Sequence, residues 1–196
     1  MKIEKLIIQN LNSIEEAEID FVNSVLAKEP LFLICGETGS GKTTILDAIT
    51  LALYDKASRY ENVRNNEKTE NGNNSTKNTT NILRKGKTDG KAELHFSING
   101  SYYVATWLVH KTKSNTYTTS NRRKLEVVDD NTRVVLSTKI EEVNKKIEEL
   151  VGLSYDQFIR SVMLAQGEFS TFLKSKKNEQ SEILEMLTGT EVYSKI

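Results

Sequence analysis

Eight residues near the beginning of the chain, G-E-T-G-S-G-K-T from Gly36 to Thr43, have the types and the spacing of a phosphate-binding loop. The glycines allow the backbone to curl, so that successive N–H groups point at one phosphate group. We expect the Lys42 ammonium to reach the β- and γ-phosphate oxygens of a nucleotide and the Thr43 hydroxyl to bind Mg²⁺. The alternative is a glycine-rich turn before a helix, with no ligand.

The elements that flank this loop favour the first interpretation. An apolar run from Leu31 to Cys35 precedes the loop and predicts a buried central strand. After Lys42, apolar residues recur at helical spacing as far as Tyr54. A helix that begins where the loop ends adds the partial positive charge of its N-terminus to the phosphate site. The expected nucleotide contacts are Gly36, Glu37, Thr38, Gly39, Ser40, Gly41, Lys42, Thr43 and Thr44.

Alternation of apolar and polar residues predicts antiparallel strands elsewhere in the chain. Ile3–Ile8 is a short apolar run, and Glu16–Phe21 alternates strictly between apolar and polar residues. Two further alternating runs, Ala92–Ile98 and Tyr102–Val109, are separated by Asn99-Gly100. Both residues of that pair can adopt positive φ, so we expect a two-residue hairpin turn.

A second hairpin is expected between Leu125 and Leu136, and it contains the stretch L-E-V-V-D-D. Such a stretch has the look of the acidic strand that holds magnesium and water in nucleotide hydrolases. However, Asp129 and Asp130 are followed by Asn131-Thr132 and a new apolar run. We therefore interpret the two aspartates as a solvated turn, and expect the acidic strand to lie outside this chain.

Helical patterns return after the second hairpin. Thr138 with Glu141 predicts a capping box for a helix that Gly152 ends, and Ser154 with Gln157 predicts a second box. A last helix is expected at 179–187, and the polar stretch 61–81 is expected to be a mobile loop. The predicted fold class is α/β, a single lobe over 1–196 with an antiparallel β region at 91–137 and a helical region at 138–196.

The composition limits the partners and the compartment. The 196 residues include 27 basic and 27 acidic side chains, so any contact with DNA must be a local patch. Lys111, Lys113, Arg122 and Arg123 are the expected DNA contacts, against the alternative of an ordinary solvated β surface. Cys35, the only cysteine, is expected to be buried and inert, and its isolation favours a reducing cytoplasm. We expect no membrane segment, because every apolar run is short.

Three further stretches carry a resemblance to a known family. They are N-L-N-S at 10–13, R-S-V-M-L-A-Q-G-E-F at 160–169 and L-T-G-T-E-V-Y at 187–193. Together with T-T-I-L-D-A-I-T-L-A-L-Y after Lys42, they closely resemble the N-terminal head segment of the SbcC family. That family provides the ATPase subunit of the SbcC–SbcD nuclease and belongs to the SMC-like DNA-repair ATPases. The resemblance implies the N-terminal lobe of a phosphate-loop NTPase head of the ABC type.

The resemblance implies roles for individual residues. Gln166 falls at the position of the Q-loop glutamine, which ligates Mg²⁺, contacts the attacking water and senses the γ-phosphate. With Lys42 it completes the expected catalytic pair. Asn12 and Ser13 fall in a hairpin that approaches the nucleotide, and Arg84 follows a loop expected to run near the base or the phosphates. Gln166 lies 124 positions after Lys42, a spacing that argues against a transporter nucleotide-binding domain.

The resemblance also implies cofactors and partners. ATP and Mg²⁺ are the expected cofactors. The signature motif and the acidic strand are expected in a C-terminal head lobe beyond a long coiled coil, which this chain lacks. A second SbcC head, an SbcD-type nuclease and double-stranded DNA are the expected partners in the processing of DNA ends and hairpins. We expect this segment alone to hydrolyse little or no ATP.

Two other functions remain open from the sequence. The first is an SMC-type DNA tether or clamp without a nuclease partner, and the second is an ABC ATPase that does not act on DNA. The neighbouring gene would distinguish these functions. A metallophosphatase-type neighbour supports the SbcC function, and a transmembrane neighbour supports the ABC ATPase that does not act on DNA.

Overall fold

The structure is a computed structural model that describes residues 1–28, 34–57, 79–112, 116–118, 122–130 and 132–161. The chain divides into two compact units, Met1–Val151 and Gly152–Ile196, and each is described by itself. Several predictions lie outside the described residues: most of the strand before the phosphate loop, most of the polar stretch 61–81, Gln166 and the helix at 179–187.

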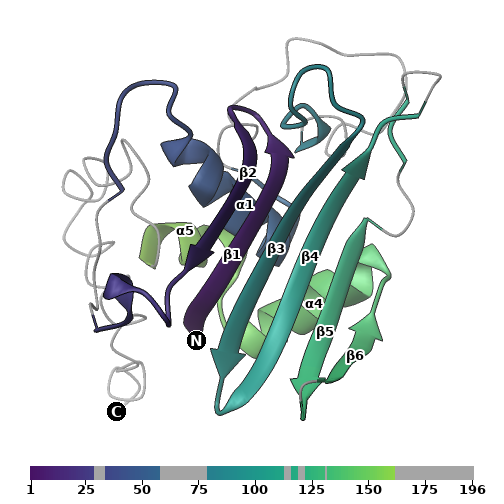
Figure 1. The fold of residues 1–196 in the computed structure, drawn as a ribbon. Helices are drawn as coiled ribbons and strands as arrows, with labels where there is room; N and C mark the ends of the chain where they lie inside the picture. Colours follow the sequence, from purple (N-terminus) through teal and green to yellow (C-terminus); the bar gives the residue numbers. More distant parts are fainter. Residues whose placement is uncertain (29–33, 58–78, 113–115, 119–121, 131, 162–196) are drawn as a thin grey trace, which may run out of the picture. The chain divides into compact units, whose positions relative to one another are not determined.

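The first unit is organised around one antiparallel sheet of six strands (Figure 1). In spatial order the strands run β2-β1-β3-β4-β5-β6. Their bounds are β1 (Lys2–Leu11), β2 (Ile14–Asp20), β3 (Asp89–Ile98), β4 (Ser101–His110), β5 (Arg123–Asp129) and β6 (Thr132–Ser137). The sequence placed an antiparallel region at 91–137, but β1 pairs with β3, so the N-terminal hairpin belongs to the same sheet.

Both predicted hairpins are present. Asn99 and Gly100 adopt φ values of +51° and +82°, as the two-residue turn between β3 and β4 requires. In the second hairpin Asp129 pairs with Thr132, and Asp130 has φ of +43° in the turn. Both aspartates are exposed, so the solvated turn predicted from L-E-V-V-D-D is confirmed.

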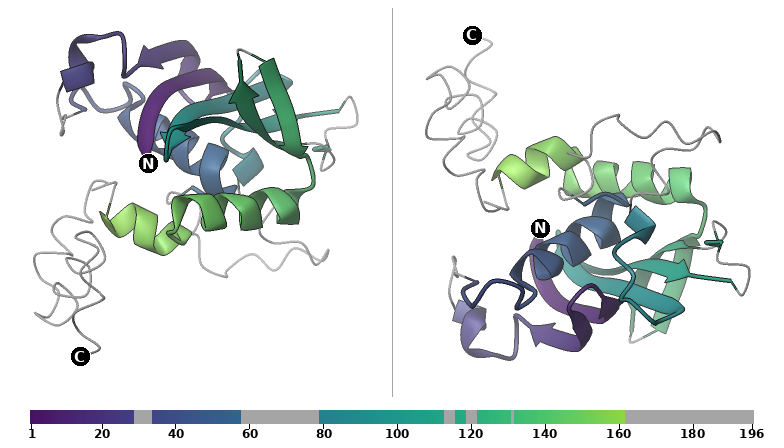
Figure 2. Two further views of the ribbon diagram at one scale, coloured as in Figure 1. Left: turned by 90° about the horizontal axis from the view of Figure 1, so that it is seen from below. Right: turned by 90° about the horizontal axis from the view of Figure 1, so that it is seen from above.

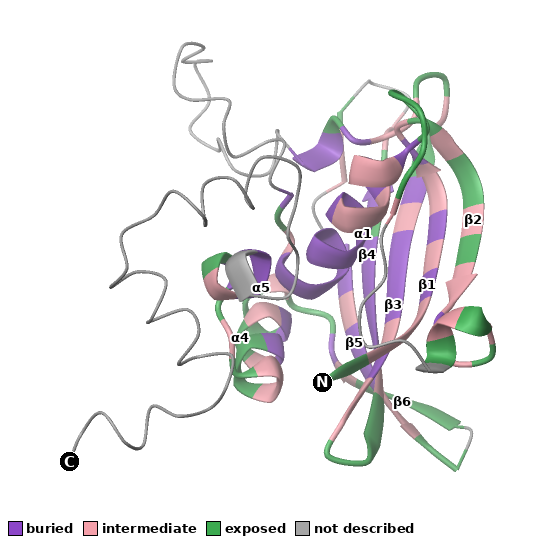
Figure 3. Cartoon of the chain, turned by 90° about the vertical axis from the view of Figure 1, so that its left-hand side faces the viewer, coloured by how far each residue is buried: buried purple, intermediate pink, exposed green. Residues whose placement is uncertain are grey.

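Two helices pack on one face of this sheet (Figure 2). Helix α1 (Lys42–Tyr54) contacts β1, β3 and β4, and helix α4 (Ile140–Val151) contacts β5, β6 and α1. Burial follows this arrangement: most of α1 is buried, whereas the edge strand β6 is largely exposed (Figure 3). The core between the layers includes Leu6, Ile8, Leu94, Phe96, Ala105, Leu125, Leu51, Ala52, Val143 and Ile147.

The helix starts agree in part with the predicted capping boxes. Just before α4, Ser137 Oγ accepts a bond from the Lys139 N–H at 3.3 Å and donates to Glu142 at 2.8 Å. In the second unit the predicted box is confirmed before α5 (Tyr155–Ser161). The Ser154 N–H donates to Gln157 Oε1 at 2.8 Å, and the Gln157 N–H donates to Ser154 Oγ at 3.4 Å. No helix in the described part of the chain is both long and apolar enough to span a membrane.

Candidate nucleotide-binding site

The phosphate loop leads directly into α1 and has the backbone conformation that its glycines allow. Gly41, the N-cap residue of α1, has φ of +99° in the left-handed region. A Cβ at Gly41 would meet Ile14 Cγ1 at 2.9 Å and Ser13 Oγ at 3.1 Å, and a Cβ at Gly36 would meet Ser40 Oγ at 2.9 Å. Glycine is therefore required at Gly41 by conformation and by space, and at Gly36 the backbone conformation favours it.

The Lys42 ammonium bonds the beginning of its own loop. Its Nζ donates to the carbonyl oxygens of Gly36 and Glu37, each at 2.7 Å, and the Ser40 N–H donates to Glu37 O at 3.2 Å. These bonds close the loop around one positive charge. The arrangement suits a phosphate, because anionic oxygens could replace the loop carbonyls as acceptors from the ammonium.

The N-terminus of α1 has no side-chain cap, since Gly41 cannot supply one, and no acidic residue lies in the first turn. The first N–H groups of a helix have no acceptor within the helix, so an anion can bond them. Thr43 is half-exposed beside them, whereas Thr44 is 2% exposed. Thr43 can therefore offer its hydroxyl to a ligand, while the buried Thr44 can offer only its N–H.

The hairpin turn between β1 and β2 lies against the phosphate loop. Ser13 and Ile14 are the residues that a side chain at Gly41 would strike. The Asn12 N–H donates to Ile82 O at 2.7 Å, and Asn12 adopts φ of +44°. Asn12 Nδ2 is buried and has no hydrogen-bond partner among the described residues. The structure thus brings Ser13 to the loop, and the contact of Asn12 with a nucleotide stays a prediction.

Arg84 holds this hairpin turn in place. Its side-chain Nη1 donates to the carbonyl oxygens of Asn12 at 3.1 Å and Ser13 at 2.7 Å. Its backbone N–H donates to Asn10 O at 2.9 Å. The Arg84 side chain therefore stabilises the backbone of the hairpin turn. The expected position of Arg84 near the base or the phosphates stays a prediction.

Two of the four expected DNA contacts are buried inside the first unit. Arg122 is 3% exposed and Arg123 is 0% exposed. Arg122 bonds the Asp55 carboxylate, and Arg123 bonds the carbonyl oxygens of Leu51 and Leu53. The prediction that these arginines contact DNA phosphates is wrong, because their donors are turned into the protein. Lys111 lies with Nζ 5.9 Å from the centroid of the Tyr117 ring, and Lys113 is outside the described residues.

The one cysteine also departs from its prediction. Cys35 was expected to be buried at the end of a central strand, but it is exposed immediately before Gly36. The signal for burial was the apolar run that precedes it, of which 31–33 lie outside the described residues.

A charge cluster occupies the sheet face opposite the helices. Glu93 Oε1 lies 2.9 Å from His95 Nε2 and 3.2 Å from Arg133 Nη2, and Glu93 Oε2 lies 3.5 Å from Lys91 Nζ. The bond with His95, helped by the charges of Lys91 and Arg133, lowers the pKa of Glu93 to about 2 although burial opposes this. His95 lies on the same polar face of β3 as Glu93.

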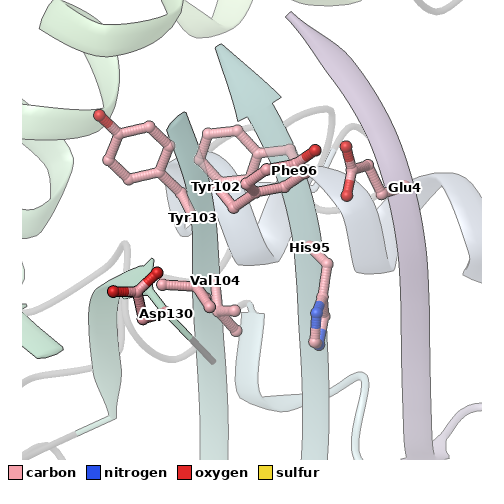
Figure 4. A pocket seen from close by; sticks show the side chains of 8 residues that line it. Glu4, His95, Phe96, Tyr102, Tyr103, Val104 and Asp130 are labelled. Carbon is pink, nitrogen blue, oxygen red and sulfur yellow. The ribbon is translucent and has the colours of Figure 1, made fainter. Parts of the chain in front are cut away.

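A pocket of about 440 Å³ opens near the turn between β3 and β4 (Figure 4). The residues that line it are Glu4, His95, Phe96, Tyr102, Tyr103, Val104, Val128 and Asp130. None of them belongs to the phosphate loop or to the turn at Asn12 and Ser13. The phosphate loop itself is exposed from Gly36 to Ser40.

Comparisons with known proteins show the family of the chain. A family model described as an AAA domain matches residues 5–195. The chain is 37% identical over 201 residues to the SbcC protein of the SbcCD nuclease from Pseudomonas aeruginosa, covering 100% of this chain and 17% of the relative. It is 36% identical over 197 residues to the protein of the same name from Bacillus subtilis, covering 98% and 16%. The chain thus spans about a sixth of the length of these curated relatives.

A solved structure of the recombination mediator protein RecF with ATP is also similar, with a TM-score of 0.41 and 13% identity. That comparison covers 70% of this chain and 28% of the other. The resemblance to SbcC that the motifs predicted is confirmed by the relatives, and the α/β phosphate-loop fold with an antiparallel sheet is confirmed by the family match. The chain belongs to the AAA domain family, and the proteins it resembles along its whole length are the SbcC members of the SbcCD nuclease.

Proposed function

We propose that this chain is the N-terminal lobe of an SbcC-like ATPase head of the ABC type, and that it binds Mg-ATP at 36–44. The observation that carries the proposal is the phosphate loop itself. Its ammonium bonds two loop carbonyls, its helix N-terminus is uncapped, and the hairpin turn at Ser13 lies against it.

Each residue of the site has a role that its chemistry supports. Lys42 and the N–H groups of the loop bind the β- and γ-phosphates, and the Thr43 hydroxyl holds Mg²⁺. Bound Mg²⁺ neutralises charge that develops on the phosphates. Asn12 and Ser13 are proposed as the nucleotide contacts from the hairpin turn. Arg84 orients that turn, and Gln166 is proposed as the second Mg²⁺ ligand and the contact with the attacking water.

The wider function follows from the relatives, whose name is that of one component of a nuclease. We propose that the complete protein closes two heads around ATP and thereby regulates an SbcD-type nuclease on double-stranded DNA ends and hairpins. A C-terminal lobe and a second head would complete each ATP site. Of the basic cluster, Lys111 and Lys113 remain as proposed DNA contacts.

Replacement of Lys42 tests the proposal in the full-length protein. Lys42→Ala removes a charge-assisted bond to phosphate, so we expect Mg-ATP affinity to fall by roughly 10- to 100-fold and ATP-dependent head dimerisation to disappear. Titration with a fluorescent ATP analogue measures the affinity, and light scattering measures the dimer.

Lys145→Ala provides the matched control, because Lys145 is exposed on α4 and makes only a 3.9 Å pair with Glu149. It should bind Mg-ATP as the wild-type protein does. If Lys42→Ala binds and dimerises as well as the control, the role proposed for the phosphate loop is wrong.

A further inference from the structure

Four side chains meet at the end of α1 that lies away from the phosphate loop. We call Asp55, Trp107, Arg122 and Arg123 the helix anchor. Asp55 is the C-cap residue of α1, with φ of +58°, and its N–H donates to Leu51 O at 3.0 Å. The Asp55 carboxylate accepts the Trp107 Nε1–H at 2.7 Å and a bond from Arg122. The last turn of α1 is thereby tied to β4 and to the beginning of β5.

Arg123 makes the most direct contact with the helix. Its Nη1 donates to Leu51 O and its Nη2 donates to Leu53 O at 2.9 Å, so one guanidinium group bridges two carbonyl oxygens of the last turn. Burial lowers the pKa of Arg123 to about 10, although the Asp55 charge acts in the opposite direction. The group remains positively charged at neutral pH, and the partial negative charge of the helix C-terminus favours it.

The anchor contains two guanidinium groups and one carboxylate, which pairs with Arg122, so the cluster carries a net positive charge while almost wholly buried. Such a charge is costly unless the partner groups stay in place. Arg122 also lies over the Trp107 ring, with 5.9 Å from its guanidinium carbon to the ring centroid. The geometry of the anchor is therefore stable only while the end of α1 remains where it is.

The hydrogen bonds of the helix anchor are directional, so they can fix the position of α1 along its axis, which apolar packing does not. Ala48, Leu51 and Ala52 hold α1 on the sheet, but hydrophobic contacts alone do not fix where a helix lies along its axis. A helix of 13 residues is about 20 Å long and moves as a stiff rod, so a shift at its last turn also moves its first. At that first turn Gly41 already lies against the Ser13–Ile14 side of the hairpin, with no room for a Cβ.

We propose that the helix anchor positions the phosphate loop, with Arg123 as the main positioning residue. By fixing α1 along the sheet, Arg123 and Asp55 determine where the N–H groups of the first turn and the Lys42 ammonium meet the phosphates. The inference rests on the nucleotide-binding function proposed above. It gives a role to two arginines that touch neither the loop nor the solvent.

Trp107 makes the proposal measurable, because it is the only tryptophan in the chain and bonds the C-cap residue directly. The full-length protein is labelled with 5-fluorotryptophan, and the Trp107 fluorine resonance is assigned by its loss in Trp107→Phe. If the anchor and the loop are coupled, each end must sense the other. We expect saturating Mg-ATP to shift this resonance, and a resonance that does not move overturns the proposal.

Arg123→Lys is the informative substitution, since lysine keeps the charge but cannot bridge two carbonyl oxygens with a planar fork. We expect this variant to shift the Trp107 resonance and to weaken Mg-ATP binding about tenfold, at a temperature where circular dichroism shows it folded. Arg133→Lys is the matched control on the opposite face of the sheet, and it should change neither. A purely structural role would lower the melting temperature and leave the affinity of the folded protein unchanged.

Asp55→Asn keeps the test decisive if Arg123→Lys does not fold. Asparagine can still accept the Trp107 bond but loses the ion pair with Arg122, so a smaller loss of affinity in the same direction is expected. An unchanged affinity in the folded variant overturns the inference. When Lys42→Ala weakens binding and the anchor variants do not, only the positioning role fails. A wild-type protein that does not bind Mg-ATP overturns both proposals.

Discussion

The two ends of α1 differ in exposure and in the way their backbone groups are bonded. At the N-terminal end, Gly36 to Ser40 are exposed and the glycine N-cap supplies no side-chain bond. At the C-terminal end, the carbonyl oxygens of Leu51 and Leu53 accept bonds from buried Arg123. An end with free polar groups can accept a ligand, whereas an end with bonded polar groups holds position. One helix thus combines a binding end and a fixed end.

Arg123→Met should produce the largest effect and would remove the fixed end. Breaking a buried charge cluster from one side costs about 3–5 kcal/mol, so amides in the last turn of α1 should exchange at least about 100-fold faster. Hydrogen-exchange mass spectrometry on the full-length protein measures this. Arg133→Met, which removes a half-exposed side chain, should leave α1 unchanged. Equal exchange in the two variants would show that Arg123 does not stabilise the helix end.

Gly41→Ala should have the next largest effect, at the binding end. Strain at a left-handed position costs about 1–3 kcal/mol, and the new Cβ also strikes the hairpin, so Mg-ATP affinity should fall by about 10- to 100-fold. Gly39→Ala is the control, because Gly39 has φ of +88° but nothing within 4 Å of its Cβ position. Equal losses in the two variants would mean that strain alone matters and that the hairpin contact does not.

Low pH should destabilise the charge cluster around Glu93 but not the helix anchor. The pKa of Glu93 lies at about 2 in the folded protein instead of the ordinary 4.5. This carboxylate therefore contributes stability above pH 4.5 that is lost as the pH falls toward 2, an amount of about 1–3 kcal/mol. Glu93→Gln should flatten the acid dependence of amide exchange in β3. An unchanged slope would mean that other carboxylates cause the acid sensitivity.

Arg84→Lys should have the smallest effect, because it alters only the support of the hairpin turn. Lysine retains the charge but lacks the planar guanidinium that fixes the direction of the bonds to Asn12 O and Ser13 O, so a loss of about 0.5–1 kcal/mol is expected, or roughly threefold in Mg-ATP affinity. The same titration measures it, with Lys85→Ala at the exposed neighbouring position as control. A loss as large as that of Gly41→Ala would indicate that Arg84 touches the nucleotide itself.

Most elements of the first unit could be predicted because their signals are short-range. Alternation marked β3 and β4, Asn99-Gly100 marked their turn, and helical spacing after Lys42 marked α1 from its first residue to its last. The G-x-x-x-x-G-K-T spacing identified the loop without any knowledge of its surroundings.

The pairing of β1 with β3 was not predictable in the same way, because strands far apart in the chain carry no local mark of their partner. The same limit applies to the basic cluster. Two adjacent arginines such as Arg122 and Arg123 are typical of a solvated or DNA-binding surface. They are buried here because their hydrogen-bond partners lie about 70 residues earlier in the chain.

Spacing and turn chemistry, which act over a few residues, were sufficient to establish the phosphate loop, its helix and the hairpins. The burial of Arg122 and Arg123, the exposure of Cys35 and the approach of the Ser13 turn to Gly41 depend on what lies opposite each residue in space. Desolvation and hydrogen-bond partners act across the folded chain, so these features emerge only when the sheet and α1 pack together.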